Sequence, residues 1–334
     1  MDLHLANPNL KNPEFYVPGL PVDWVTAHYG IPPDEVAKLG SAENPFGPSP
    51  KALASITAEL GNVHMYSPWT AEPLREALAA KYGYTPENFV CGSGETEVIA
   101  LIIRAFAEPG GQVLMTRPCF PMYHLFAEAE GRHPVYIDTP TMTCEVDAYI
   151  DAIGPDTRIV FVTNPHSPSG TWLEEADVRR IVQAAPHALV ALDEAYVHYS
   201  DTPGYIHLAA EYDNLIVLRT FSKAFGLAGL RLGFGVAHPD LIPTAMAEFD
   251  AVLGDRPDQR DRLRDDVQVT ADQLLDLSVP DARVTNAGVR HNVSAGLRYL
   301  ESWLRGTGAA AVDGLPGHDP QPPGAAQEPP AARP

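Results

Sequence analysis

The feature that most constrains the fold is an alternation of short apolar runs and helical patterns between residues 85 and 237. The apolar runs at residues 112–115, 157–164 and 215–218 are each short enough to be a buried strand. Strands that alternate with helices predict an α/β fold, in which a mostly parallel sheet carries helices on both faces and is joined by right-handed crossovers. Ligands bind such sheets at the carboxyl ends of the strands, so polar residues at those ends are the first candidates for a site.

The run at residues 215–218 leads into a lysine that is a candidate nucleophile. Lys223 follows Ser222 among small and apolar residues, and Arg231 lies eight residues beyond it. Burial disfavours the ammonium form of lysine, which makes the free amine available for Schiff-base chemistry with an aldehyde. The alternative interpretation is a lysine at a helix start whose ammonium group reaches solvent.

A glycine turn is a candidate anion site. Residues 88–98 read NFVCGSGETEV, a short strand, a glycine turn and the first turn of an apolar helix that runs to about residue 106. The free N–H groups and the dipole of a helix start attract anions, although a GxG turn alone is a weak signal.

Two further strands end in polar residues, Asn164 and Asp193. Asp193 and Glu194 form an acidic pair that could also bind a metal ion. No His, Cys or third acid lies at ligand spacing from the pair, so we predict no metal site.

Residues 220–234, TFSKAFGLAGLRLGF, resemble the lysine motif of fold-type I pyridoxal-phosphate-dependent aminotransferases, and are most similar to the histidinol-phosphate aminotransferase branch. The resemblance covers roughly residues 30–237 and predicts the fold of that family. It implies a pyridoxal 5'-phosphate cofactor whose aldehyde is held by Lys223 and whose phosphate is contacted by Ser222 and Arg231.

The same resemblance assigns the glycine turn, Gly94, Glu95 and Thr96, to the cofactor phosphate. Glu95 departs from the family, which usually has a small hydroxyl residue there. Only the backbone N–H of Glu95 can help to bind an anion, so we expect its carboxylate to point away from the anion.

The remaining cofactor contacts implied by the resemblance lie at strand ends and in loops. Asp193 would keep the pyridine nitrogen protonated, because an opposite charge favours the protonated form, and the ring then acts as an electron sink. Phe120 would stack on the cofactor ring, and Asn164 and Tyr196 would bond its phenolic oxygen. Without the resemblance, Phe120 would be interpreted as a core aromatic residue.

Two more residues concern the substrate and a second subunit. The resemblance implies that Asn44, in the loop at residues 41–50, lines the substrate pocket. It also implies that Tyr66 reaches the cofactor phosphate of a partner subunit, which predicts a homodimer. From the residues alone, a surface turn and a packed tyrosine are the simpler interpretations.

Past residue 237 a different resemblance begins. Residues 290–315, RHNVSAGLRYLESWLRGTGAAAVDGL, are similar to the malate synthase family, but the acidic motif that carries the catalytic aspartate in that family does not follow. We predict an arm at residues 1–40, an aminotransferase large domain at 41–237, a malate-synthase-like helical fragment at 238–315 with an amphipathic helix at 291–304, and a disordered Pro-rich tail at 316–334. Our hypothesis is a gene fusion in which the aminotransferase small domain, with its arginine for the substrate carboxylate, is truncated or replaced.

Composition and charge exclude several other classes. A net charge of −20 argues against nucleic acid or an anionic membrane as partner. Cys91, Cys119 and Cys144 are too few and too widely spaced for a disulfide framework or a zinc site, so we expect a reducing, cytoplasmic setting. The first thirty residues show no signal peptide, and no apolar run has the length of a membrane span.

The expected reaction is the transfer of an amino group between an amino acid or amine and a 2-oxo acid, in which Lys223 shuttles a proton. A lyase, decarboxylase or oxidase on the same scaffold is one alternative, since the way the substrate is held decides which bond breaks. A cofactor-binding remnant without turnover is a second alternative, and residual malate synthase activity is a third.

Overall fold

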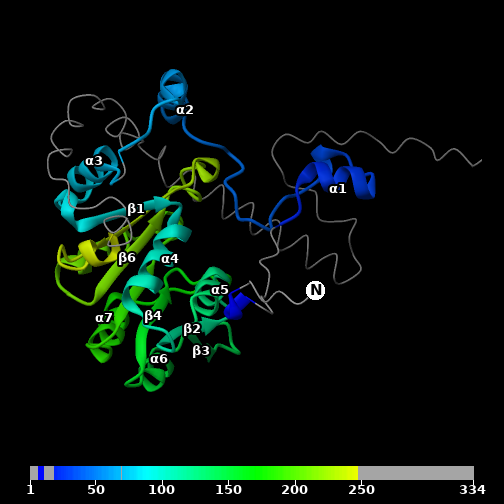
Figure 1. Ribbon diagram of the computed structural model, residues 1–334. Helices are drawn as coiled ribbons and strands as arrows, with labels where there is room; N and C mark the ends of the chain where they lie inside the picture. Colours follow the sequence, from blue (N-terminus) through cyan, green and yellow to red (C-terminus); the bar gives the residue numbers. More distant parts are fainter. Residues whose placement is uncertain (1–6, 11–18, 69, 247–334) are drawn as a thin grey trace, which may run out of the picture. The chain divides into compact units, whose positions relative to one another are not determined.

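The computed structural model describes residues 7–10, 19–68 and 70–246. Its centre is a seven-stranded sheet with the strand order β1-β7-β6-β5-β4-β2-β3 (Figure 1). The strands are β1 Phe89–Ser93, β2 Gln112–Arg117, β3 His133–Asp138, β4 Thr157–Thr163, β5 Leu189–Asp193, β6 Leu215–Thr220 and β7 Leu232–Ala237. Only β7 runs antiparallel to its neighbours, β1 and β6, so the expectation of a mostly parallel α/β sheet is confirmed.

Seven α-helices lie in the described ranges. They are α1 Val22–Tyr29, α2 Pro50–Glu59, α3 Glu72–Tyr82, α4 Glu95–Phe106, α5 Met122–Ala129, α6 Val146–Ala152 and α7 Glu175–Ala184. Six of these helices are predicted from the sequence, by the patterns at residues 22–28, 51–60, 73–82, 95–106 and 174–184 and by the turn at 117–123 that leads into a helix. Helix α6 is too short to be recognised from its pattern. The amphipathic helix expected at residues 291–304 lies outside the described residues.

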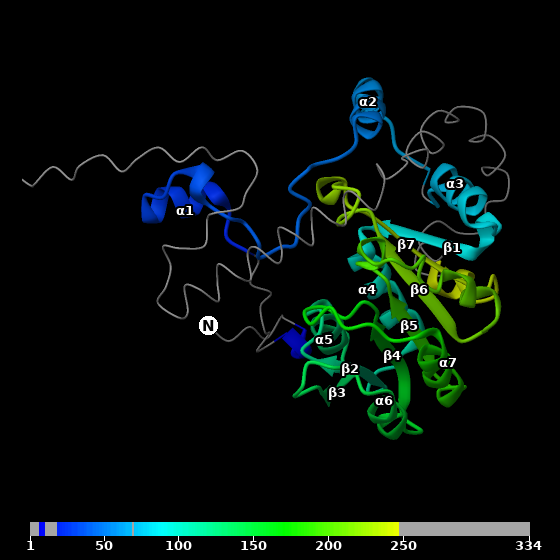
Figure 2. The ribbon, with the colours of Figure 1, turned by 180° about the vertical axis from the view of Figure 1, so that it is seen from behind.

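Helices cover both faces of the sheet, because the central strands send side chains alternately into two apolar cores. Val160 and Val162 of β4 pack in one core with residues of α6 and α7. Ile159 and Phe161 of the same strand pack in the other core with residues of α4 and α5. Figures 1 and 2 show these two helix pairs on opposite sides of the sheet. A strand that is buried on both faces is a continuous run of apolar residues in the sequence. This is why β4 could be predicted from the sequence.

The carboxyl ends of β4, β5 and β6 meet at one edge of the sheet because these strands are parallel neighbours. Asn164 follows β4, Asp193 ends β5 and Lys223 follows β6. The turn between β1 and α4 joins this edge, since the N–H of Gly94 donates to the carbonyl oxygen of Arg231 at 2.8 Å.

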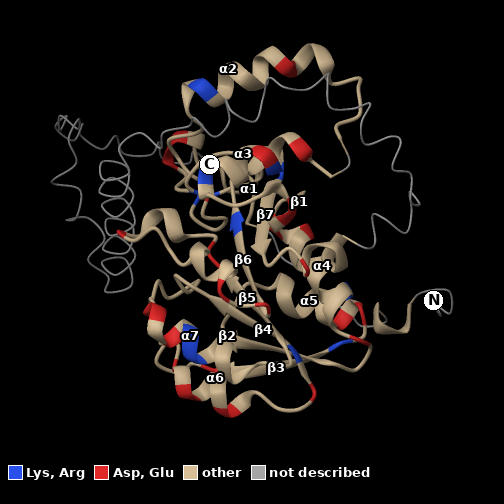
Figure 3. Cartoon of the chain, turned by 90° about the vertical axis from the view of Figure 1, so that its left-hand side faces the viewer, with Lys and Arg blue, Asp and Glu red and all other residues tan. Residues whose placement is uncertain are grey.

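Acidic residues occur on helices α2, α3 and α7. Figure 3 shows red acidic segments on α2, α3 and α7. Within the described ranges, every helix is too short or too polar to cross a membrane.

Candidate active site

Lys223 lies in the irregular loop that follows β6 rather than at a helix start. Its Nζ atom donates a hydrogen bond to the carbonyl oxygen of Ser41 at 2.9 Å and lies 5.5 Å from the centroid of the Tyr196 ring. Burial lowers the pKa of the Lys223 ammonium group, while the nearby carboxylates of Glu95, Glu43 and Asp193 act in the opposite direction. The ammonium group of Lys223 therefore loses its proton more easily than that of an exposed lysine. Schiff-base chemistry requires the free amine that results.

The loop that begins at Ser41 packs against the lysine loop. The Asn44 amide donates to the carbonyl oxygen of Ala224 at 2.9 Å, and its Oδ1 accepts from the N–H of Phe46 at 3.0 Å. Gly226, with φ of +68°, allows a close approach, because a Cβ atom there would lie 2.5 Å from the backbone of Gly47. Asn44 thus anchors its loop beside Lys223, and its contact with substrate stays a prediction.

The glycine turn forms a cup of hydrogen-bond donors. Gly94 is the N-cap of α4 with φ of +77°, and a Cβ atom at this position would lie 2.3 Å from Nη2 of Arg231. Only glycine therefore lets the Arg231 guanidinium lie over the turn. Ser222 lies next to Lys223, and its Oγ accepts from the Thr220 hydroxyl at 3.0 Å. A helix start with an adjacent guanidinium is a favourable environment for a phosphate group.

Glu95, in the first turn of α4, is a buried acid. The residue is 7% exposed, and its carboxyl lies close enough to the Asp193 carboxyl for each to affect the pKa of the other. The expectation that this carboxylate points away from a bound anion stays a prediction. Burial and the neighbouring Asp193 raise the pKa of Glu95 well above its usual range. The side chain of the first residue of a helix can turn to either side, and only the packing against β5 decides between them.

Asp193 is buried at the end of β5 and held by two donors. Its Oδ1 accepts from the N–H of Ala195 at 2.9 Å, and its Oδ2 accepts from the hydroxyl of Tyr123. Burial raises the pKa of Asp193, while these two hydrogen bonds lower it. The Tyr123 hydroxyl also lies 3.1 Å from Oγ1 of Thr163.

Sequence reasoning missed Tyr123 as a site residue. The only available signal was its position three residues after Phe120, which places both aromatic rings at the start of α5. The rings of Phe120 and Tyr123 meet edge to face at 5.7 Å between centroids. Phe120 therefore lies at the same edge of the sheet as Asp193, and its stacking on a cofactor stays a prediction.

Asn164 is fully buried beside Asp193. Its backbone N–H donates to the Asp193 carbonyl oxygen at 2.8 Å, and its side-chain amide exchanges two hydrogen bonds with the backbone of Leu173. A carboxamide has two N–H hydrogens, and the Leu173 carbonyl oxygen takes one of them. His166, two residues further on, bonds Ser169 and the Pro118 carbonyl oxygen, so its role is structural.

The acid beside Asp193 is structural. Glu194 is buried in an ion pair with Arg219, at 2.7 Å between Oε2 and Nη2, and its other oxygen accepts from the N–H of Tyr205. Three or more His, Cys, Asp or Glu side chains do not come together as a metal cluster anywhere in the described ranges.

The structure therefore brings most of the predicted residues to one edge of the sheet. The residues that lie together there are Lys223, Asp193, Arg231, Ser222, Tyr196 and the Gly94–Thr96 turn. Tyr66 is fully exposed, after α2, and its contact with a partner subunit stays a prediction.

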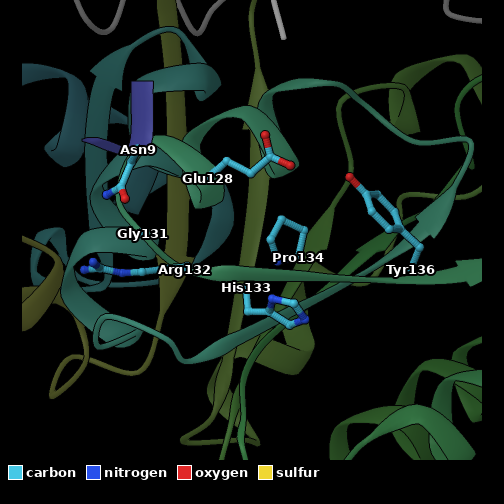
Figure 4. Close-up of a pocket in the computed structure, with 7 residues that line it drawn as sticks. All are labelled: Asn9, Glu128, Gly131, Arg132, His133, Pro134 and Tyr136. Atoms are coloured by element: carbon cyan, nitrogen blue, oxygen red, sulfur yellow. The ribbon is translucent and has the colours of Figure 1, made fainter. Parts of the chain in front are cut away.

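A separate hollow of about 500 Å³ lies beside the edge strand β3 (Figure 4). It is lined by Asn9, Glu128, Gly131, Arg132, His133, Pro134 and Tyr136. None of the predicted site residues lines this hollow.

Residues 34–253 match the family described as aminotransferase class I and II, and residues 283–316 match the C-terminal part of malate synthase. The chain is 41% identical over 245 residues to a histidinol-phosphate aminotransferase of Anaeromyxobacter, a match covering 71% of this chain and 66% of the relative. It is 41% identical over 225 residues to the Methanosarcina mazei enzyme of the same name, covering 67% and 61%.

Among solved structures, the fold is similar to a histidinol-phosphate aminotransferase of Sinorhizobium meliloti in complex with pyridoxal-5'-phosphate. The TM-score is 0.64 at 25% identity, over 90% of this chain and 76% of that one. The chain spans only about two thirds of the length of the first relatives it matches, 66% and 65%. The family match covers more than half of the chain, and the chain therefore belongs to the class I and II aminotransferase family.

Proposed function

We propose that this protein is a pyridoxal-phosphate-dependent aminotransferase of the histidinol-phosphate aminotransferase type. It would move an amino group between an amino acid or amine and a 2-oxo acid. The observation that carries the proposal is the half-buried Lys223, whose amine lies at the same sheet edge as the buried Asp193 and the Gly94 turn.

The side chains fit a phosphorylated pyridine aldehyde. Such a molecule needs an amine for its aldehyde, a buried acid for its ring nitrogen and a cup of donors for its phosphate. Lys223 and Asp193 supply the first two, and the start of α4 with Arg231 supplies the third. The glycine at position 94 supports this assignment, because a Cβ atom would displace the guanidinium from the cup.

When bound, the cofactor supplies an electron sink that stabilises negative charge on the substrate carbon. Lys223 would hold the aldehyde carbon and, as a free amine, take a proton from the substrate carbon and return it. Asp193 would hold a proton on the ring nitrogen, and Tyr123 would orient the Asp193 carboxyl.

The other residues would position the ring. Ser222, Arg231 and the N–H groups of Gly94, Glu95 and Thr96 would bind the phosphate. Phe120 would stack on the ring, and Asn164 and Tyr196 would bond its phenolic oxygen. Asn44 would line the substrate pocket, and Tyr66 would complete the site of a second copy in a homodimer.

Absorbance and borohydride trapping test this proposal. The purified protein should be yellow or become so with added pyridoxal phosphate, and reduction should label Lys223 in the peptide mass spectrum. Lys223→Ala should lose the label, whereas Lys81→Ala, which removes an exposed lysine on α3, should keep it. A colourless protein that takes up no cofactor, or a label on another residue, would contradict the proposal.

Turnover needs its own test, because the matched region is shorter than the relatives. Mixing the loaded protein with amino acids and amines should convert the cofactor absorbance, and a 2-oxo acid should restore it. Release of CO₂, ammonia or H₂O₂ without amine transfer would indicate the decarboxylase, lyase or oxidase alternative. Retained colour without conversion across a broad panel would indicate a remnant without turnover.

A further inference from the structure

The Glu95 carboxyl is a buried acid in the candidate site to which the proposed function gives no role. Its Oε1 atom is buried and has no donor within hydrogen-bonding distance. Its neighbour is the Asp193 carboxyl, and two ionised carboxylates cannot donate to each other. A single proton removes the conflict, because a protonated Glu95 donates to Asp193. Buried polar atoms without partners are rare, so the unpartnered oxygen indicates this proton.

Several charged or titratable groups act on the Glu95 carboxyl. Asp193 and Glu194, at the end of β5, both disfavour a second negative charge there. The Lys223 amine, after β6, favours the charge, and Tyr123, on α5, binds the far side of Asp193. Burial is the largest of these effects and raises the pKa of Glu95, which favours the acid form.

The position of Glu95 places it in competition with the proposed cofactor. The Asp193 carboxylate can accept a hydrogen bond from protonated Glu95 or from a protonated pyridine nitrogen. Arg231 lies over the preceding residue, Gly94, so the same turn presents donors for a phosphate. The first turn of α4 therefore supplies donors for the cofactor phosphate. It also carries the Glu95 side chain, which would bond the Asp193 carboxyl that the ring nitrogen of the cofactor needs.

We propose that the Glu95 carboxyl is a built-in competitor of the cofactor: it donates a proton to Asp193 and must leave before a pyridine nitrogen can bond that residue. This inference rests on the proposed pyridoxal-phosphate site. Leaving the pocket exposes Glu95 to water, where its carboxyl ionises at neutral pH. Loading would then release one proton more than it would in a protein without this acid.

Cofactor titrations with three variants test the competition. Glu95→Ala removes the competitor and should tighten the Kd for pyridoxal phosphate by roughly 10- to 100-fold, the range for one hydrogen bond to a charged group. Glu95→Gln keeps a donor to Asp193 and cannot ionise, so its Kd should not tighten as that of Glu95→Ala does. Glu76→Gln makes the same change at an exposed site on α3 and should leave the Kd unchanged.

The pH dependence gives a second measurement. The ratio of the natural Kd to the Glu95→Gln Kd should fall as pH rises, by at most about tenfold per pH unit, since only the natural protein releases the extra proton. Equal tightening in the Ala and Gln variants would assign the effect to charge repulsion alone and overturn the proposal. An unchanged Kd in Glu95→Ala would also overturn it.

Infrared spectroscopy reads the Glu95 proton without any cofactor. Protein freed of cofactor should show the C=O stretch of a protonated carboxylic acid at neutral pH, and Glu95→Gln should lack it. If the protein bound the cofactor normally but showed no C=O band of a protonated acid, the proposed competition by Glu95 would be overturned. The proposed function would then still stand. Failure of Glu95→Ala and of the natural protein to take up any cofactor would overturn both.

Discussion

At the scale of single residues, the Asp193 carboxyl depends on donors from distant parts of the chain. Tyr123 lies 70 residues away in sequence, and its hydroxyl donates to the Asp193 carboxyl. Such a bond favours the ionised form of a buried carboxylate, which is the form that can pair with a protonated ring nitrogen.

We expect Tyr123→Phe to weaken cofactor binding and to lower the free energy of unfolding by about 1.5–3 kcal/mol, as for a hydrogen bond to a charged group. Tyr149→Phe is the matched control, because Tyr149 is equally buried but its hydroxyl donates to a neutral backbone oxygen, that of Phe161, at 3.3 Å. Its loss should be about 0.5–1.5 kcal/mol, without an effect on cofactor binding. Urea unfolding and cofactor titration measure both quantities. Equal effects of the two variants on cofactor binding would refute the role given to Tyr123.

At the scale of elements, β7 and the start of α4 are in close backbone contact. A Cβ atom at Gly233 of β7 would lie 2.0 Å from the backbone nitrogen of Glu95. Backbone atoms cannot move aside as the end of a flexible side chain can, so this glycine sets how closely the anion cup approaches the sheet.

Gly233→Ala should therefore lower the free energy of unfolding by about 1–3 kcal/mol or more, through overpacking. It should also weaken cofactor binding, because the first turn of α4 must shift. Gly229→Ala is the control, since a Cβ atom there would meet no atom within 4 Å, and its effect should stay within about 0.5 kcal/mol. Thermal unfolding with and without cofactor compares the two, and similar melting temperatures would count against the close-contact argument.

The elements also show which parts of the fold a sequence reveals. Strands β4, β5 and β6 were predictable because a strand buried on both faces must be apolar throughout. The antiparallel direction of β7 was not, because its glycines and apolar residues fit either direction. Helix α6 has only seven residues, too few for a clear period.

At the scale of the whole molecule, the partly buried His198 couples stability to pH. Burial lowers the pKa of His198 to about 3, and the positive charges of Arg219 and Lys81 act in the same direction. The folded protein therefore keeps His198 neutral at pH values where the unfolded chain, with a pKa of about 6.5, binds a proton. Stability should fall as pH drops from about 6.5 towards 3.

Replacing this side chain tests the coupling. His198→Gln should show a shallower loss of unfolding free energy between pH 6.5 and 4, measured by urea unfolding at several pH values. His64→Gln, a change at an exposed histidine, should follow the natural protein. If His198→Gln and the natural protein gave the same slope, His198 would have no part in acid sensitivity.

The proposed homodimer is also a property of the whole molecule. Five apolar side chains between residues 39 and 65 are 58–77% exposed: Leu39, Phe46, Leu60, Val63 and Met65. A charge placed among them should weaken association if a second copy covers this segment. Val63→Asp should raise the dimer Kd at least about tenfold in sedimentation equilibrium, the effect of about 1.4 kcal/mol. Met142→Asp, an exposed apolar residue outside the segment, is the control, and a dimer unaffected by Val63→Asp would place the interface elsewhere.

By itself, the sequence determined the α/β class, the strand ends that carry Asn164, Asp193 and Lys223, and the lysine motif of the family. These features are local, because they follow from the periods of strands and helices and from short runs of residues. Only the tertiary structure decided that Glu95 turns inward, that Tyr123 bonds Asp193 and that the Ser41 carbonyl oxygen meets Lys223. Such contacts join residues up to 182 positions apart, and packing rather than any local pattern selects them.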